Sequence, residues 1–480
     1  MFYRLSLNHL LSSGKRSVHC LFAAALAYQF MTNPAMAESS SRGASITTAR
    51  EQTTGLDTPL REKTAPGVVS SKSRVADSAF VGHAGESSRL ADNNLAASAA
   101  AERGIEAAAV AEVAQASSNG SGVNSTPITT AEFAASLEYD ILSARLRGDL
   151  TLASTLSQSL QANESTQLMG LALEIDNLAT ELSWDTSNTQ YDARIRTLAS
   201  TLIEHCKRKF DRVPAVEAFH CGRGHFALSF LSGVRGSYYQ AGVNGTQAIR
   251  AFESALDRTP DHVAIKLPLG MAYYYADHLP SFVKMVAPLL WFIPSGSSYK
   301  SLPYLREVTE MEGPYQDAAL FVLGDLLIQS PTHQGSAWEY FEPLAKRYPT
   351  NPRIHLALIG GFVVADDWQR AEQAVNTMLA HVPLDKTAHR LLADMWWVYA
   401  RWHQGKSIGE SATSRLQAAT LTEQPQWVRT CFELAQALAT EAAGDEKSAI
   451  TIYQTISERG RWDAWPWLTE LATERLIALQ

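Results

Sequence analysis

The chain has 480 residues and a formal net charge of −8, with 46% hydrophobic and 19% charged residues. An acidic balance argues against a nucleic-acid binder, which needs a basic surface to neutralise phosphates. Four cysteines in this length exclude a disulfide-framework protein. All 11 tryptophans lie at or after Trp184, and Phe80 is the only Phe, Tyr or Trp between Glu38 and Thr130. We therefore expect one part of the chain to bury a core and another part not to.

Residues 1–37 have the features of a secretory signal peptide. They contain no Asp or Glu, and three cations precede a short apolar stretch that begins at Leu21. A small-x-small site ending at Ala37 predicts cleavage before Glu38. The apolar stretch, about 11 residues, is too short to span a bilayer. Cleavage would lower the Lys and Arg count from 41 to 38 against 49 acidic residues, a net charge of −11. A mitochondrial presequence is the alternative, because the leader is acid-free and its basic region is long.

The segment 38–130 is rich in Ser, Ala and Gly. It offers too little apolar surface to offset an ordering entropy of about 1–2 kcal/mol per residue, so we expect it to be disordered. From residue 131 onward, apolar residues recur at three- and four-residue spacing without sustained alternation. This periodicity predicts an all-α fold over 131–480.

A spacing of 34 residues separates two Gly-x-x-Tyr motifs, which begin at Gly236 and Gly270. Gly236 is followed by Ala248, Phe252, Ala255 and Pro260 at the spacing of a tetratricopeptide (TPR) repeat. In this interpretation Gly236 lies on the first helix of a hairpin and allows the second helix to approach closely, while Phe252 fills the gap.

Weaker copies of the pattern follow downstream, and an insertion of about 20 residues lies near 280–303. The small residues that mark the first helices of these copies are Gly324, Gly360, Ala393 and Ala435. Several phased units predict a right-handed α-solenoid of TPR-like helix pairs. Residues 131–228 are expected to form degenerate or capping helices, and 229–480 the repeats.

The chain from about Tyr139 onward resembles signal-peptide-bearing TPR proteins of proteobacteria that have no assigned activity. The stretches 269–284 and 289–296 carry the resemblance. They are also similar to a eukaryotic TPR family of the mitochondrial outer membrane, although that family has Gly-Asp where this chain has Ser295-Gly296. The resemblance implies a binding role and assigns no catalytic residue.

TPR solenoids present side chains of each first helix to their concave face, where a mixture of aromatic, Arg and Asp residues suits a peptide or protein surface. Positions 2, 5, 9 and 12 of the phased repeats predict a partner-binding groove formed by Tyr274, Phe321, Asp325, Arg390, Asp394, Trp397, Arg429 and Phe432. Packing between neighbouring repeats is the alternative role for several of them, Phe321 and Phe432 especially.

Two cysteines, Cys206 and Cys221, lie at equal distances from an expected turn at Val213-Pro214. A hairpin there could bring them within disulfide reach, and an exported protein would favour the bond. Free thiols, or a zinc site shared with neighbouring histidines, are the alternatives. Cys431 is expected to be a small buried hydrophobe.

No metalloprotease, nucleophile-elbow or EF-hand motif is present, so we expect no enzyme, no cofactor and no metal. The sequence favours a non-catalytic scaffold of the periplasm or cell envelope that binds a protein or peptide, and no nucleic acid. A solute- or glycan-binding accessory subunit of an envelope enzyme or transporter is the alternative, using the groove or the cluster of Trp462, Trp465 and Trp467. The apolar stretch 279–294 is expected to pack on the solenoid, with peripheral membrane contact as its alternative. The oligomeric state stays open.

Overall fold

The computed structural model describes residues 130–480 except 208, 279–296, 329–333, 410–412, 417–423 and 460–465. All of the described residues belong to one unit. The predicted signal peptide, residues 38–129 of the predicted disordered segment, most of the 280–303 insertion, Trp462 and Trp465 lie outside the described residues.

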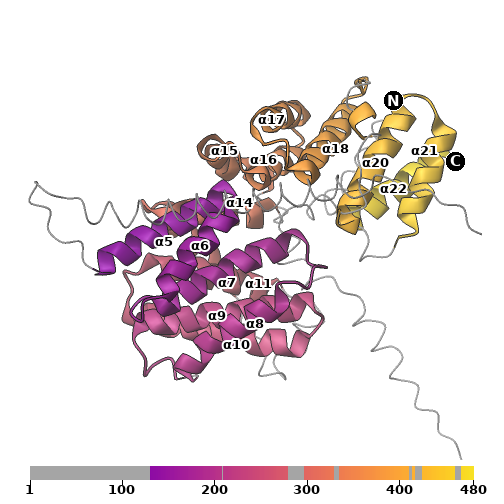
Figure 1. The fold of residues 1–480 in the computed structure, drawn as a ribbon. Helices are drawn as coiled ribbons and strands as arrows, with labels where there is room; N and C mark the ends of the chain where they lie inside the picture. Colours follow the sequence, from indigo (N-terminus) through magenta and orange to yellow (C-terminus); the bar gives the residue numbers. More distant parts are fainter. Residues whose placement is uncertain are drawn as a thin grey trace, which may run out of the picture. The chain divides into compact units, whose positions relative to one another are not determined.

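Every regular element of the described part is a helix, as the apolar periodicity predicted, and these residues contain no strand (Figure 1). The α-helices are α5 (Thr130–Arg147), α6 (Leu150–Gln161), α7 (Gln167–Trp184), α8 (Asp192–Cys206), α9 (Ala215–Val234), α10 (Tyr238–Arg258), α11 (Lys266–Asp277), α13 (Ser298–Thr309), α14 (Pro314–Ile328), α15 (Trp338–Arg347), α16 (Pro352–Val364), α17 (Trp368–His381), α18 (Thr387–His403), α20 (Gln426–Ala442), α21 (Glu446–Ser457) and α22 (Pro466–Leu479). Two short 3₁₀ helices are η3 (Val263–Ile265) and η5 (Gln334–Ser336).

Three of the turns between consecutive helices use the same local chemistry. A residue with positive φ ends one helix, and an Asp that follows it caps the next helix through its carboxylate. Gly148 (φ 83°) precedes the cap of α6, and Gly444 (φ 87°) precedes the cap of α21. Before α17, Asp366 (φ 57°) takes the place of the glycine and Asp367 accepts a bond from the Arg370 amide. These short connections make consecutive helices pack as antiparallel pairs.

The pairs α14/α15, α16/α17 and α20/α21 match the helix pairs that the TPR pattern predicted. On each second helix the signature residue, Phe341, Val375 or Tyr453, is fully buried. Gly324 on α14 lies so close to Phe341 that a Cβ at this glycine would be 2.8 Å from the Phe341 ring. The small residue on the first helix therefore permits the close approach that the pattern implies.

The phase of the first predicted repeat is wrong. Gly236 lies in the turn between α9 and α10 with φ 72°, and a Cβ there would meet no atom within 4 Å. Ala248 and Phe252 belong to the same helix as Tyr239, α10. The helix that packs against α10 is α9. A Cβ at Gly222 of α9 would lie 2.5 Å from the Phe252 ring. A Gly-x-x-Tyr motif fits a turn followed by a helix as well as it fits a helix interior, and this ambiguity misplaced the first helix. The predicted boundary between residues 228 and 229 accordingly lies inside α9.

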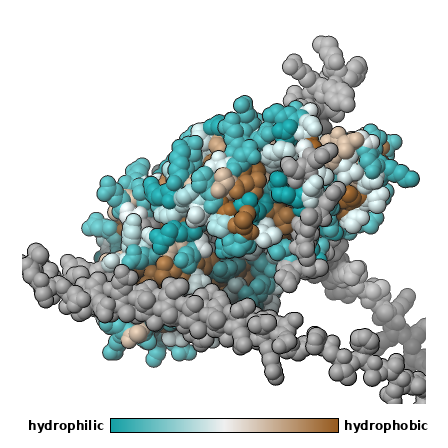
Figure 2. All heavy atoms as spheres, turned by 45° about the horizontal axis from the view of Figure 1, so that its top comes forward, coloured by the Kyte–Doolittle hydropathy of each residue, from teal (hydrophilic) through white to brown (hydrophobic). Residues whose placement is uncertain are grey.

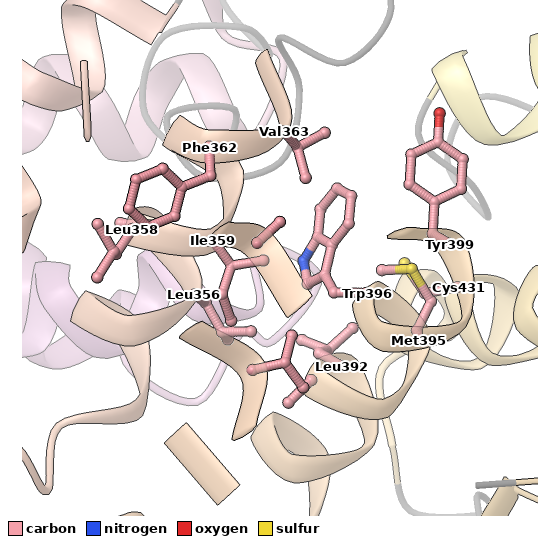
Figure 3. Close-up of a cluster of buried hydrophobic side chains, with 14 of the residues drawn as sticks. Leu356, Leu358, Ile359, Phe362, Val363, Leu392, Met395, Trp396, Tyr399 and Cys431 are labelled. Carbon is pink, nitrogen blue, oxygen red and sulfur yellow. The ribbon is translucent and has the colours of Figure 1, made fainter. Parts of the chain in front are cut away.

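The largest hydrophobic cluster extends from α11 and α13 through α14 to α22. Figure 3 shows part of it, where Ile359 and Val363 of α16 lie near Trp396 of α18. Cys431 of α20 is fully buried there, as expected for a small hydrophobe. The face seen in Figure 2 is mainly hydrophilic, with separate apolar areas of limited extent. The core of the described residues is thus divided between this cluster and three smaller clusters in helices α5 to α11.

The N-terminal helices contact elements that lie far from them in the sequence. The Tyr315 hydroxyl of α14 donates to Glu138 of α5, and the Asn351 amide donates to the Leu146 carbonyl at 2.7 Å. Arg353 of α16 donates to the Thr180 carbonyl of α7 at 2.6 Å. Helix α5 thus contacts α14 and the residue before α16, and α7 contacts α16, in addition to their sequence neighbours.

Candidate partner-binding pocket

Three of the eight predicted groove residues line one pocket. Arg390, Asp394 and Trp397 follow each other on α18 at steps of four and three residues, which places them on one helix face. The pocket has a volume of about 460 Å³. Its lining residues are Asn376, Leu379, Leu384, Thr387, Arg390, Leu391, Asp394, Trp397 and Arg415. It lies between α17, α18 and a helical turn at residues 413–416.

The charged groups of the pocket are held in place by hydrogen bonds. Asp394 is buried and accepts two bonds from Arg415, from Nη2 at 2.6 Å and from Nε at 3.1 Å. Such a bidentate pair orients both side chains. The hydrogen bonds to Asp394 raise the pKa of Arg415. Arg390 uses Nη1 to bond the carbonyls of Leu379 and Val382, at 2.9 and 2.7 Å, and so ties α18 to the end of α17. Two cations and one carboxylate leave the pocket with an excess positive charge.

The apolar groups of the pocket are more accessible. Leu384 is 80% exposed, which is unusual for a leucine and places an apolar side chain at the pocket rim. Trp397 is half-buried, and the Arg401 guanidinium lies 4.8 Å from its ring centre. A rim of accessible apolar surface beside fixed charges can contact both the side chains and the polar groups of a peptide.

The other five predicted groove residues do not line this pocket. Tyr274 is buried, stacks on His278 at 3.9 Å and donates to the Leu326 carbonyl. Phe321 packs edge-on against Phe341, with ring centres 5.7 Å apart.

Phe432 and Asp325 are also buried, and burial raises the pKa of Asp325 to about 8. Arg429 is half-buried, and its Nε has no hydrogen-bond partner among the described residues. Packing inside the fold thus occupies Tyr274, Phe321, Asp325 and Phe432. Partner contact by any of the eight residues stays a prediction.

The structure joins Cys206, the last residue of α8, to Cys221 of α9 in a disulfide with Cα atoms 6.4 Å apart. The turn between these helices provides the hairpin from which the pairing was inferred. The Nε2 atom of His205 lies 2.8 Å from a carboxylate oxygen of Glu217. His220 is buried, and its burial, followed by the positive charge of Arg223, lowers its pKa. Among the described residues no group of His, Cys, Asp and Glu could hold a metal ion.

The tryptophans near the C-terminus were an alternative ligand site. Trp467 is 1% exposed and stacks on Trp396, with ring centres 5.9 Å apart. Its ring therefore belongs to the core and does not offer a face to a glycan.

Sequence reasoning missed several residues that the structure brings into the pocket. Leu384, Leu379 and Asn376 come from α17 and the loop after it, and Arg415 comes from a separate helical turn. Only Leu384 carried a local signal, because it stands between Pro383 and Asp385 in a turn where an apolar residue is out of place. The contribution of Arg415 depends on tertiary packing.

No described helix is long and apolar enough to span a bilayer. No family model matches the sequence. No curated protein matches it either. Among solved structures, the crystal structure of yeast Tom70 is similar over 72% of this chain and 88% of that chain, at 12% identity and a TM-score of 0.24. This degree of similarity assigns neither a fold nor a function.

Proposed function

We propose that the chain is a non-catalytic scaffold that binds a protein or peptide, and that the pocket lined by α17, α18 and residues 413–416 is a contact site for this partner. In this proposal the helix pairs are arranged as a right-handed TPR solenoid. The main support is the convergence of Arg390, Asp394 and Trp397, which the repeat phase alone had selected, on one accessible pocket.

The chemistry of the pocket suits an extended peptide. Leu384 and Trp397 offer apolar surface, and the positive excess favours a segment that carries a carboxylate. The Asp394–Arg415 pair fixes the orientation of the charges before binding. A preorganised surface loses less side-chain entropy on binding than a flexible one.

The test is affinity capture from cell extract followed by mass spectrometry, with the full chain as bait. Leu384→Asp and Trp397→Ala change the pocket without touching the bonds of Arg390 or Asp394. Ile477→Asp is the matched control, because Ile477 is an apolar residue of α22 that is 70% exposed and does not line the pocket.

We expect a partner that the wild-type chain and Ile477→Asp both retain and that both pocket variants lose by about tenfold or more, a change of about 1.4 kcal/mol. A partner held equally by all four proteins would place the binding surface elsewhere and end the assignment of this pocket.

We further propose export to the cell envelope. The leader of residues 1–37 motivates this location, and the Cys206–Cys221 disulfide supports an oxidising compartment. Mass spectrometry of the protein purified from its native cells should find a mature N-terminus at Glu38 and the two cysteines resistant to alkylation before reduction. An intact Met1 with two alkylated thiols would exclude this location.

A further inference from the structure

Arg390 of the pocket uses only one end of its guanidinium group within the chain. Its Nη1 atom donates hydrogen bonds to the carbonyls of Leu379 and Val382, at 2.9 and 2.7 Å. Its Nε and Nη2 atoms form no hydrogen bond within the described part of the chain. Arg390 is half-buried and lines the pocket. One end of the group is therefore anchored to the backbone, and the Nε–Nη2 edge is left for a ligand.

The Nε–Nη2 edge of an arginine can bind a carboxylate through two parallel hydrogen bonds, and the pocket already contains one such pair. Arg415 uses these two atoms to hold Asp394, at 3.1 and 2.6 Å. Arg390, in contrast, forms no ion pair with any described residue. The pocket thus has one uncompensated positive charge, which a single carboxylate matches. A phosphate dianion suits it less, because Asp394 adds a negative charge one helical turn away.

The neighbours of Arg390 along α18 indicate where this carboxylate lies in the partner. The pocket residues Thr387, Arg390, Asp394 and Trp397 follow each other at steps of three, four and three, so they form one row along the helix. Leu384 lies in the loop that leads into the row, and Trp397 forms its other end. At 1.5 Å per residue, Arg390 and Trp397 are about 10 Å apart along the helix, which is the length of about three residues of an extended chain. The Nε–Nη2 edge therefore lies between two apolar groups.

We propose that Arg390 is the specificity-determining residue of the pocket, and that it binds the side-chain carboxylate of a Glu or Asp that stands between two apolar residues of the partner. This inference rests on the proposed function, because it names the ligand of the same pocket. Leu384 and Trp397 contact the apolar residues on the two sides of the acidic one. A terminal carboxylate would have chain on one side only and would leave one of these contacts unused. Because Nη1 stays bonded to the two carbonyls, the guanidinium is oriented before the partner binds, which reduces the entropy lost on binding.

The probe is a set of immobilised peptides that are offered to the full chain. Each peptide is acetylated and amidated, and it has Leu two positions before and three positions after a central residue, with Gly and Ser elsewhere. The central residue is Glu, Gln, Lys or phosphoserine. We expect the Glu peptide to bind at least about tenfold more tightly than the Gln peptide, because only a carboxylate pairs with the guanidinium edge. The Lys and phosphoserine peptides should also bind more weakly than the Glu peptide.

A further peptide, with a central Gln and an unblocked C-terminus after its last Leu, tests whether a chain end can supply the same carboxylate. We expect it to bind no better than the amidated Gln peptide.

Variants of the chain then locate the preference for Glu over Gln. Arg390→Gln should lose it, and Arg390→Lys should keep part of it, because an ammonium group keeps the charge without the two-bond edge. Lys386→Gln is the matched control for charge, since Lys386 stands four residues before Arg390 and does not line the pocket. Its preference should stay within about twofold of wild type, because salt screens an exposed charge. Arg258→Gln is the control for anchoring, because Arg258 donates to the carbonyls of Phe210 and Val213 away from the pocket.

Equal binding of the Glu and Gln peptides to the wild-type chain would overturn the proposal, and so would a chain that binds none of the peptides. A preference for phosphoserine or for the unblocked C-terminus would overturn the assignment of a side-chain carboxylate. An equal loss of preference in Arg390→Gln and Lys386→Gln would show a general electrostatic attraction and would overturn the role of Arg390. The comparison in the wild-type chain needs no variant, so it decides the question even where Arg390→Gln does not fold.

Failure of this inference is distinguishable from failure of the proposed function. A captured partner that Leu384→Asp and Trp397→Ala lose and Arg390→Gln retains would keep the pocket as a contact site and remove Arg390 as its specificity determinant. A partner that all of these variants retain would remove the pocket itself.

Discussion

In the α9–α10 hairpin the structure places the close helix–helix contact at Gly222 of α9. The TPR spacing had predicted it at Gly236, which lies in the turn that follows α9. A Cβ at Gly222 would lie 2.5 Å from the Phe252 ring, closer than any real Cβ contact. Phe252 is fully buried and has the rings of Phe219 and Phe226 as neighbours at 6.0 and 6.3 Å, so it has no room to move aside. Gly222→Ala is therefore an overpacking substitution.

The magnitude follows from two opposing terms. Overpacking a tight core costs about 1–3 kcal/mol, and replacing Gly by Ala inside a helix returns at most about 1 kcal/mol. We expect Gly222→Ala to lower the free energy of unfolding by about 1–2 kcal/mol. Gly236→Ala should cost a similar about 1–2 kcal/mol for another reason, because its φ of 72° disfavours any Cβ while the space around it is open.

A second substitution separates the two causes. Phe252→Leu shortens the side chain that faces Gly222, so Gly222→Ala should cost less in its presence, with a coupling of about 0.5–3 kcal/mol. Gly236→Ala and Phe252→Leu should be additive within about 0.5 kcal/mol. Gly236→Asn, which tolerates positive φ, should recover much of the stability lost in Gly236→Ala.

The assay is urea unfolding followed by circular dichroism for the single and double variants. The reasoning would be refuted by the reverse pattern, in which Phe252→Leu relieves Gly236→Ala and not Gly222→Ala. That result would return Gly236 to the helix–helix contact that the TPR spacing had suggested.

Three further predictions concern the disulfide, a buried carboxyl and a helix cap. The double variant Cys206→Ser,Cys221→Ser should lower the free energy of unfolding by about 3 kcal/mol, because the disulfide closes a loop with a sequence separation of 15. Urea unfolding without reductant measures this loss. An unchanged free energy of unfolding would mean that the bond is absent. Burial raises the pKa of Asp325 to about 8, so the folded chain keeps a proton that the unfolded chain releases above about pH 4. The free energy of unfolding should thus fall as pH rises from about 4 to 8. This decrease should be smaller in Asp325→Asn. Urea unfolding at pH 5 and at pH 8 measures it, and an equal decrease in the wild-type chain and in the variant would contradict the assignment. Asp367→Ala removes the bond to the Arg370 amide and should cost about 1 kcal/mol in the same assay, whereas Asp367→Asn should cost much less.

Local chemistry was readable from the sequence. Apolar spacing predicted an all-helical chain, and the turns at Gly148, Asp366 and Gly444 follow from residues that tolerate positive φ beside an Asp that caps a helix. The shared face of Arg390, Asp394 and Trp397 was also predictable, because steps of four and three residues return to one side of a helix.

The tertiary structure decided which residues meet across the chain. Gly236 carried a valid TPR spacing, yet Gly222 makes the close contact, because a motif of four residues does not specify whether it lies in a turn or in a helix. Nothing local to Arg415 or Trp184 indicates Asp394 or His389 as a partner.

Helical periodicity and turn preferences act over a few residues, so the sequence by itself determined the helical class of this protein and the pairs α14/α15, α16/α17 and α20/α21, but not the pair α9/α10. The contacts of α5 and α7 with α14, α16 and α18 join residues more than 170 positions apart, as between Arg353 and Thr180. Such contacts depend on how buried surfaces fit together in three dimensions. For that reason only the tertiary structure decided the pocket on α18 and the ring contacts of Trp184 with His389 and Trp427.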